Sequence, residues 1–158
     1  MEKITLETTV HAPIERVFDL SRSIDLHEIS TIGTDEEAIA GRTSGLIELD
    51  EYVTWRAKHL GVYQKLTVKI TKMERPYFFE DQMLKGAFSK MKHLHQFVSI
   101  DEGTKMIDVF EFQSPFGIIG TLVNKLFLKN YMTRFLIVRN QEIKRVAEGE
   151  DWKKILID

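Results

Sequence analysis

The sequence predicts an α+β fold in which a curved antiparallel sheet of about six or seven strands wraps around a long C-terminal helix. Three observations lead to this prediction. Several stretches before residue 115 alternate between apolar and polar residues, which is typical of half-buried strands. Short turn sequences join these stretches, so neighbouring strands are expected to run antiparallel. From residue 115 onward, apolar residues recur at helical spacing instead.

The N-terminal part is expected to hold one strand and two short helices. Residues 4–10 alternate strictly and predict the first strand. Pro13 suits the first turn of the first helix, and a second short helix is expected at residues 26–30. The polar, glycine-containing stretch 31–45 is interpreted as a loop.

The middle of the chain predicts a series of strands joined by tight turns. They are expected at residues 46–59, 62–73, 76–84, 89–100 and 104–114. Gly61 and Gly86 are the expected turn residues of two hairpins, and the last turn is expected to be centred on Glu102 and Gly103.

One long helix is expected from Pro115 to about Glu148, before Gly149. Its roughly 32 residues would span roughly 45–50 Å. Basic residues are assigned to its solvent face: Lys125, Lys129, Arg134, Arg139 and Lys144. We interpret residues 1–149 as a single domain and residues 150–158 as a short C-terminal tail.

Composition excludes several classes of function. The net charge of −2 argues against a nucleic-acid binder with a broad basic surface. The absence of cysteine excludes disulfides and thiolate metal sites. The longest uncharged stretch, residues 112–124, is too short to span a membrane, and the N-terminus lacks the apolar core of a signal peptide. A cytoplasmic location is expected.

Two histidines in the stretch FEDQMLKGAFSKMKHLHQF (residues 79–97) raise the question of a site. His93 and His95 would share one face of a strand because side chains alternate. Antiparallel pairing would place Asp81 opposite or diagonal to His93. Asp108 would lie across from Phe97 and diagonal to His95. This face is rich in aromatic residues and methionines, so it is predicted to be the covered, concave one.

We predict a pocket between this face and the long helix. Its predicted ligand-binding residues are Trp55, Phe79, Asp81, Met83, Phe88, Met91, His93, His95, Phe97, Asp108, Phe110, Phe112, Leu122 and Leu126. No cofactor is expected. His11 and His59, near strand ends, are expected to be solvated, whereas His27 falls in the short helix that would cover the pocket.

Three interpretations of Asp81, His93, His95 and Asp108 remain open. They are a buried network of carboxylate–imidazole pairs, polar anchors for a mainly apolar ligand, or a metal or acid–base site. The diagonal placement of the aspartates favours carboxylate–imidazole pairs over convergence on one ion, so no metal is predicted. No serine lies in a recognisable nucleophile motif.

Two motifs resemble the START-like superfamily, also called SRPBCC, which includes bacterial polyketide cyclase/dehydrase proteins, lipid-transfer domains and Bet v 1 allergens. The first is VHAPIERVFD (residues 10–19). The second resembles a bacterial subfamily pattern, F-x-D-x-Q-x-x-G-P-[FY]-x-x-W-x-H-x-H-x-F. Departures from this pattern are Met83, Ala87 and Met91, where it has glutamine, proline and tryptophan. The resemblance implies a helix-grip fold that binds an apolar or amphipathic small molecule, with catalysis in some branches.

Three functions are therefore weighed. The first is non-catalytic binding of a small hydrophobic or amphipathic molecule by a carrier, sensor or chaperone. The second is a polyketide cyclase or dehydratase-like enzyme, in which a His–Asp pair drawn from His93, His95, Asp81 and Asp108 would move protons. The third is an interaction protein whose core is filled by its own side chains.

Overall fold

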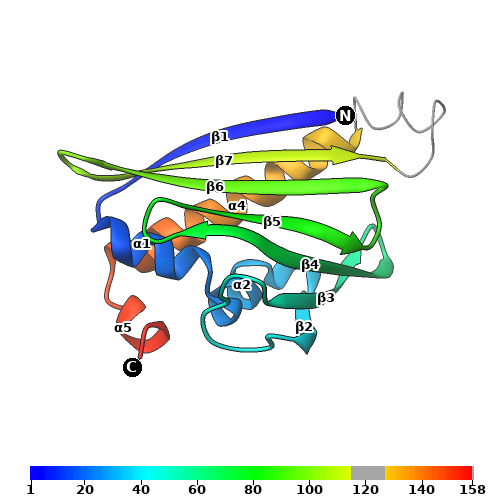
Figure 1. Cartoon of the computed structure of the whole chain (residues 1–158), viewed down its shortest axis with the longest axis horizontal. Coiled ribbons are helices and arrows are strands. Elements are labelled where there is room, and N and C mark those ends of the chain that lie inside the picture. The colour runs from blue at the N-terminus through cyan, green and yellow to red at the C-terminus, as the bar shows by residue number, and fades with distance from the viewer. Residues whose placement is uncertain (115–126, 158) are drawn as a thin grey trace.

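The computed structural model describes residues 1–114 and 127–157 and contains, within them, one seven-stranded antiparallel sheet (Figure 1). The strand order is β1-β7-β6-β5-β4-β3-β2. The strands are β1 Glu2–Val10, β2 Glu37–Gly41, β3 Tyr52–His59, β4 Val62–Glu74, β5 Phe78–Lys85, β6 Lys90–Ile100 and β7 Gly103–Gln113. The α+β prediction and the antiparallel arrangement are confirmed.

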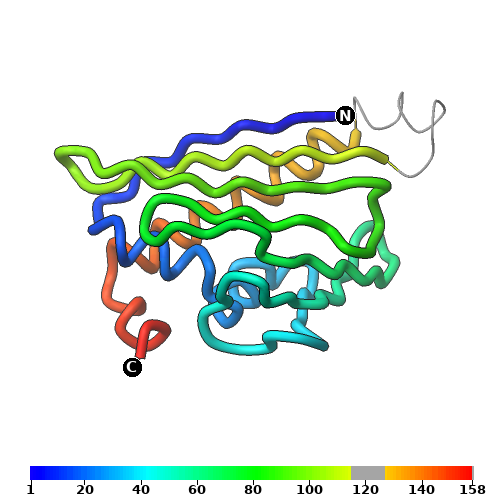
Figure 2. The backbone as a smooth tube through the Cα atoms, in the orientation of Figure 1, coloured from blue at the N-terminus to red at the C-terminus, as the bar shows by residue number. Residues whose placement is uncertain are grey.

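The described helices are α1 Ile14–Ser21, α2 Ile24–Ser30, a 3₁₀ turn η1 Ile32–Thr34, α4 Lys129–Glu148 and α5 Trp152–Ile155. α4 runs along one face of the sheet, and α1 and α2 lie beside it (Figure 1). The two long strands β6 and β7 form a hairpin that projects at one end of the molecule (Figure 2). None of the helices in these ranges combines the length and apolar character needed to cross a membrane.

The core lies between the sheet and the helices. Phe18 of α1 is fully buried and meets the rings of Phe79 and Phe97 edge-on, at centroid distances of 5.5 and 5.3 Å. Ser23 caps α2 by accepting a hydrogen bond from the Leu26 amide at 3.1 Å, which explains why a new helix starts so soon after α1 ends. These contacts fix the short helices against the concave face of the sheet.

Two segments differ from the sequence prediction. Residues 37–41, expected to be a loop, form the edge strand β2, whose inward-leaning residues are alanines that give little apolar signal. The segment 46–51, expected to be strand, is not part of β3. Asp50 adopts a positive φ of 67°, which interrupts extended structure, and Leu46 makes only an isolated bridge with Ser23.

The β6–β7 turn lies one residue earlier than predicted, because Ile100 pairs with Gly103. Gly103 therefore begins a strand and is not a turn residue. A Cβ at this position would lie 2.3 Å from the carbonyl oxygen of Val10, and its φ of 144° also favours glycine. The close approach of β1 accounts for the glycine.

The predicted long helix and the predicted C-terminal tail can both be compared with the structure. α4 is confirmed as helix from Lys129 to Glu148, whereas the expected start of the long helix, residues 115–126, lies outside the described residues. In the tail, the Trp152 ring of α5 lies beneath the guanidinium group of Arg16, 3.9 Å from the ring centroid. The tail thus contacts α1.

Candidate functional site

The predicted concave face is covered by α4 and the short helices. Along β6, Met91, His93, His95 and Phe97 are buried, whereas Gln96 between them is exposed. The same alternation in β7 buries Asp108 completely. Local strand geometry therefore places two imidazoles and a carboxylate in the protein interior.

Strand register brings Asp81 opposite His93 and Asp108 opposite His95. The expected pairing of Asp108 with Phe97 is wrong, because Phe97 pairs with Met106 as a consequence of the earlier turn. Side-chain hydrogen bonds then run diagonally. Nε2 of His93 donates to Oδ1 of Asp108 at 2.8 Å, and Nε2 of His95 donates to Oδ2 of Asp81 at 2.9 Å.

α4 completes this network with two residues that were not predicted. Asn140 donates to Oδ2 of Asp108 at 2.7 Å, and Arg139 donates to the Asn140 side-chain oxygen at 3.0 Å. Arg139 was assigned to the solvent face, but it is only 4% exposed. The signal was its position: Leu136, Arg139 or Asn140, and Ile143 recur at helical spacing on the apolar stripe of α4.

Burial and hydrogen bonding set the protonation of the network. Burial raises the pKa of Asp108, but the hydrogen bond from His93 and the attraction of the nearby His93 and His95 rings outweigh it and leave the pKa well below its ordinary value. Burial likewise raises the pKa of Asp81, but its hydrogen bond with His95 and the attraction of that ring leave the pKa lowered. Burial, reinforced by His95, lowers the pKa of His93 to about 4. At neutral pH, His93 is therefore a neutral hydrogen-bond donor to an ionised Asp108.

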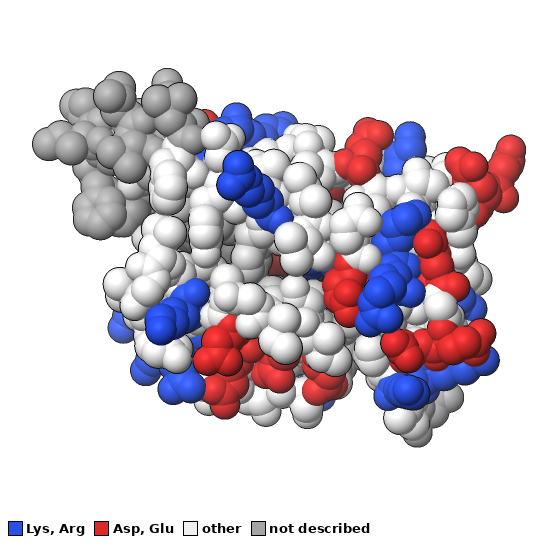
Figure 3. All heavy atoms as spheres, turned by 180° about the vertical axis from the view of Figure 1, so that it is seen from behind, with Lys and Arg blue, Asp and Glu red and all other residues white. Residues whose placement is uncertain are grey.

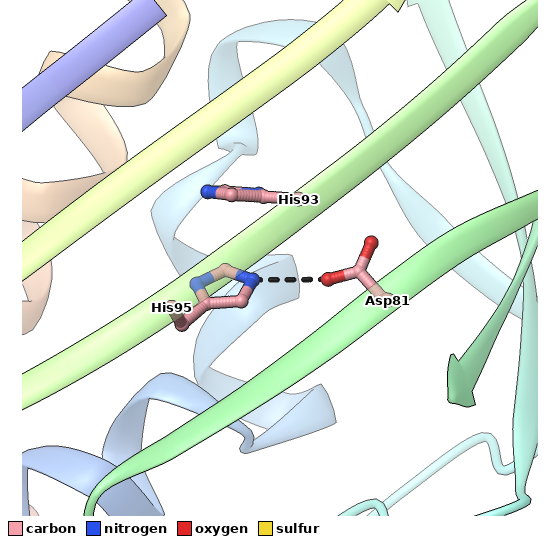
Figure 4. A group of neighbouring side chains, drawn as sticks. All are labelled: Asp81, His93 and His95. Atoms are coloured by element: carbon pink, nitrogen blue, oxygen red, sulfur yellow. Dashed lines mark hydrogen bonds and ion pairs between the residues drawn. The ribbon is translucent and has the colours of Figure 1, made fainter. Parts of the chain in front are cut away.

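Asp81, His93 and His95 could each offer one ligand atom within 4.8 Å of the others, a spacing that one metal ion can bridge. The two imidazoles lie next to each other, with centroids 3.7 Å apart and planes tilted by 35° (Figure 4). Nε2 of each ring donates to a carboxylate, so in this arrangement these two nitrogens present an N–H and not the lone pair that a metal ion binds. The observed geometry fits carboxylate–imidazole pairing better than metal binding.

One nitrogen of this network has no hydrogen bond among the described residues. Nδ1 of His95 lies 3.1 Å from Oδ1 of Asp108 but is poorly aligned with it, so proximity here is not a hydrogen bond. A neutral imidazole has a single N–H and can donate to only one of two flanking carboxylates. Stacking of Phe79 on His95, with centroids 4.2 Å apart, fixes the ring in this position.

A cavity of about 120 Å³ lies between this face and α4. The predicted residues that line it are Trp55, Phe79, Asp81, Phe88, Met91, His93, His95 and Phe110. Four predicted residues are not part of its lining: Met83, Phe97, Asp108 and Phe112. Leu122 and Leu126 lie outside the described residues. A binding role for each of these residues stays a prediction.

Sequence reasoning placed His27 in the short helix over the pocket but missed its partner Glu36, which immediately precedes β2 and forms with it a second polar group on the cavity wall. The His27 ring contacts Trp55 with centroids 4.2 Å apart and planes tilted by 33°, and its Nε2 lies 3.3 Å from Oε2 of Glu36. His59 is not solvated as expected: it is half-buried and its Nδ1 contacts the Tyr131 hydroxyl at 2.7 Å. Burial lowers the pKa of His59.

The face of the molecule seen from behind is hollowed near its middle, and charged atoms are visible in the hollow (Figure 3). Lysine and arginine side chains on this face are interspersed with aspartate and glutamate (Figure 3). Such a mixed surface does not form the broad basic patch that phosphate backbones bind.

Solved structures share this fold at low sequence identity. Protein TTHA0849 from Thermus thermophilus has a TM-score of 0.72 and 17% identity, covering 92% of this chain and 99% of that one. Ginseng major latex-like protein 151 from Panax ginseng has a TM-score of 0.69 and 10% identity, with coverages of 94% and 98%. Ara h 8.0201 has a TM-score of 0.61 and 14% identity, with coverages of 90% and 97%. The chain thus has the helix-grip fold of START-like and Bet v 1-like proteins. No protein-family model and no curated protein matches its sequence.

Proposed function

We propose that this protein binds a small hydrophobic or amphipathic molecule between its sheet and α4 without transforming it, as a carrier, sensor or chaperone. The observation that carries the proposal is the cavity. Its wall is mainly apolar and aromatic, with a few polar groups such as Asp81 and His93. Ligand sites in proteins typically have this composition, in which apolar area supplies affinity and a few polar groups fix orientation. Ligand binding is also general among proteins of the Bet v 1-like fold.

Cavity size limits the expected ligand. An apolar cavity of about 150 Å³ accommodates a benzene ring. The cavity bounded by the described residues measures about 120 Å³, so a single ring or a short chain is the expected size class. Burial of its apolar surface would contribute about 25 cal/mol per Å² before the costs of association.

A second candidate is an enzyme that uses His93 as a base. One observation favours it: Nε2 of His93 is oriented by Asp108, as in catalytic pairs that leave the other nitrogen free. However, a general base works best when its pKa is near the operating pH. With a pKa of about 4, His93 is poorly suited to remove a proton at neutral pH. Binding is therefore the better supported function.

The test is native mass spectrometry of the purified protein, combined with small-molecule extraction and metal analysis of the same sample. A stoichiometric apolar molecule that is lost in a Trp55→Ala variant supports the proposal. A Gln96→Ala variant, altered at an exposed position of β6, should retain the ligand. Stoichiometric zinc or iron that disappears in His93→Ala would contradict the proposal and identify a metal site. Turnover that falls by orders of magnitude in His93→Ala while binding persists would favour the enzyme.

A further inference from the structure

Glu36 has a buried carboxylate on the cavity wall. The described residues around it compensate its negative charge only in part. Its side chain is 7% exposed and it lines the cavity together with His27 and Trp55. Within the described residues, Oε2 of Glu36 makes no hydrogen bond, and neither does Nε2 of His27 beside it. Buried polar atoms are nearly always hydrogen-bonded, and the 3.3 Å approach of His27 Nε2 to Oε2 is an ion-pair contact without hydrogen-bond geometry, so this oxygen can still accept a hydrogen bond from a further donor.

The described groups near Glu36 do not supply a permanent positive charge. Among the described residues, the ion partner of Glu36 is His27, an imidazole that is charged only when protonated. The adjacent His59 is half-buried and already contacts Tyr131. Burial raises the pKa of Glu36, but the attraction of His27 and His59 outweighs it and leaves the pKa lowered. Glu36 is therefore ionised at neutral pH.

The arginines that line the cavity in the described part of the chain are already engaged. Arg22 contacts Asp19 at 2.8 Å and Glu48 at 2.6 Å. Arg139 donates to Asn140 and to a backbone carbonyl of α1. A ligand carboxylate would find neither guanidinium group free, and it would face the carboxylates of Asp81 and Glu36. Burying like charges together is unfavourable.

We propose that the cavity selects a small aromatic molecule carrying a protonated amine, with the ammonium group directed at Glu36. This inference rests on the proposed binding function and names the class of ligand. An ammonium group has three donors and no acceptor, so it can pair the free oxygen and neutralise the carboxylate at once. A hydroxyl group can donate to the free oxygen but cannot neutralise the carboxylate, and a ligand carboxylate can do neither of these. Aromatic residues on the wall, including Trp55, Phe79, Phe88 and Phe135, suit a planar ring.

The experiment is an NMR titration of the ¹⁵N-labelled protein at pH 7 with benzylamine, benzyl alcohol and benzoate, which have similar rings and different polar groups. The chain contains two tryptophans. The indole N–H of Trp55, on the cavity wall, should shift on binding, whereas that of Trp152, stacked with Arg16 on the tail, should not. We expect benzylamine to bind about tenfold more tightly than benzyl alcohol, and benzoate to bind most weakly.

A matched pair of variants tests the role of Glu36. Glu36→Gln keeps the shape and removes the charge, and should reduce benzylamine affinity about tenfold while changing benzyl alcohol affinity less than about twofold. Glu37→Gln is the control, because the Glu37 side chain is 56% exposed and pairs with Arg56 on the surface. It should leave all three affinities unchanged.

Equal binding of benzylamine and benzyl alcohol, or a preference that survives in Glu36→Gln, would overturn the amine inference and leave the binding function intact. If none of the three compounds shifts the Trp55 indole, both the inference and this size class of ligand are wrong. The ranking in the wild-type protein decides the question even if Glu36→Gln does not fold.

Discussion

Asp108 and Glu36 are both carboxylates with almost no exposed side-chain surface, yet their surroundings differ. Each oxygen of Asp108 accepts a hydrogen bond, one from His93 and one from Asn140. Oε2 of Glu36 accepts none within the described residues. A fully paired buried carboxylate stabilises the fold, whereas an incompletely paired one on a cavity wall is free to meet a ligand. The two carboxylates thus differ in how completely the described residues satisfy them, which is why we propose a ligand contact for Glu36 and not for Asp108.

The largest effect is expected from Asp108→Ala. This change leaves His93 and Asn140 buried without their common acceptor and Arg139 without the nearby carboxylate, and removing one partner of a buried charged network costs about 3–5 kcal/mol. Urea unfolding should show this loss in the free energy of unfolding. Asp101→Ala, at the exposed β6–β7 turn, is the control and should change stability by less than about 0.5 kcal/mol. A similar small effect at Asp108 would mean that the network does not support the fold.

Acidification should destabilise the protein in two steps. An unfolded histidine titrates near pH 6.5, whereas the pKa of His93 in the folded protein is about 4. The unfolded state therefore binds more protons between these values, and stability falls as pH drops from about 6.5 to about 4, by on the order of 3 kcal/mol. Below about pH 4, protonation of Asp81 and Asp108, whose pKa values are lowered, removes further stability.

His93→Gln should flatten the first of these two steps, as measured by urea unfolding at a series of pH values. His11→Gln serves as its control, since His11 is exposed. An unchanged slope in His93→Gln would show that another group is responsible for the acid sensitivity.

A smaller loss is expected from Asn140→Leu. The substitution keeps the branched shape of the side chain but removes both the donor to Oδ2 of Asp108 and the acceptor of the Arg139 N–H, so buried polar groups lose a partner at a cost of about 2 kcal/mol. Gln141→Leu, at the next and exposed position of α4, should be nearly neutral. Thermal unfolding of the two variants compares them directly. If Gln141→Leu were the more destabilising, the orientation of α4 described above would be wrong.

Sequence patterns predicted the fold well where side chains carried the signal. Alternation in β6 identified the buried face of His93 and His95, because a period of two is visible in the side chains. It failed for β2, where Ala38 and Ala40 pair through the backbone and contribute little apolar contrast. Gly103 was wrongly predicted to be a turn residue, which shifted the predicted β6–β7 register by one position. A glycine is required there because β1, far away in sequence, approaches its backbone closely.

The site was predictable only in part, for a similar reason. Two histidines on one strand indicated a polar cluster. Arg139 was assigned to the solvent face because it is charged, although its position lies on the apolar stripe of α4. His27 and Glu36 follow no period: one belongs to a short helix and the other precedes an edge strand. The contact between His27 and Glu36, and that between His27 and Trp55, arise only from the tertiary structure.

The smallest stability effect, and the sharpest contrast with Asp108, is expected from Glu36→Gln. Because the pKa of Glu36 is lowered, its charge is favoured in the folded state, and neutralising it should reduce the free energy of unfolding slightly. The reduction should stay below about 1 kcal/mol, since Oε2 loses no hydrogen bond. Urea unfolding beside Asp108→Ala measures the difference. A loss as large as that of Asp108→Ala would mean that Glu36 supports the fold as Asp108 does, and the unpaired oxygen would no longer indicate a ligand.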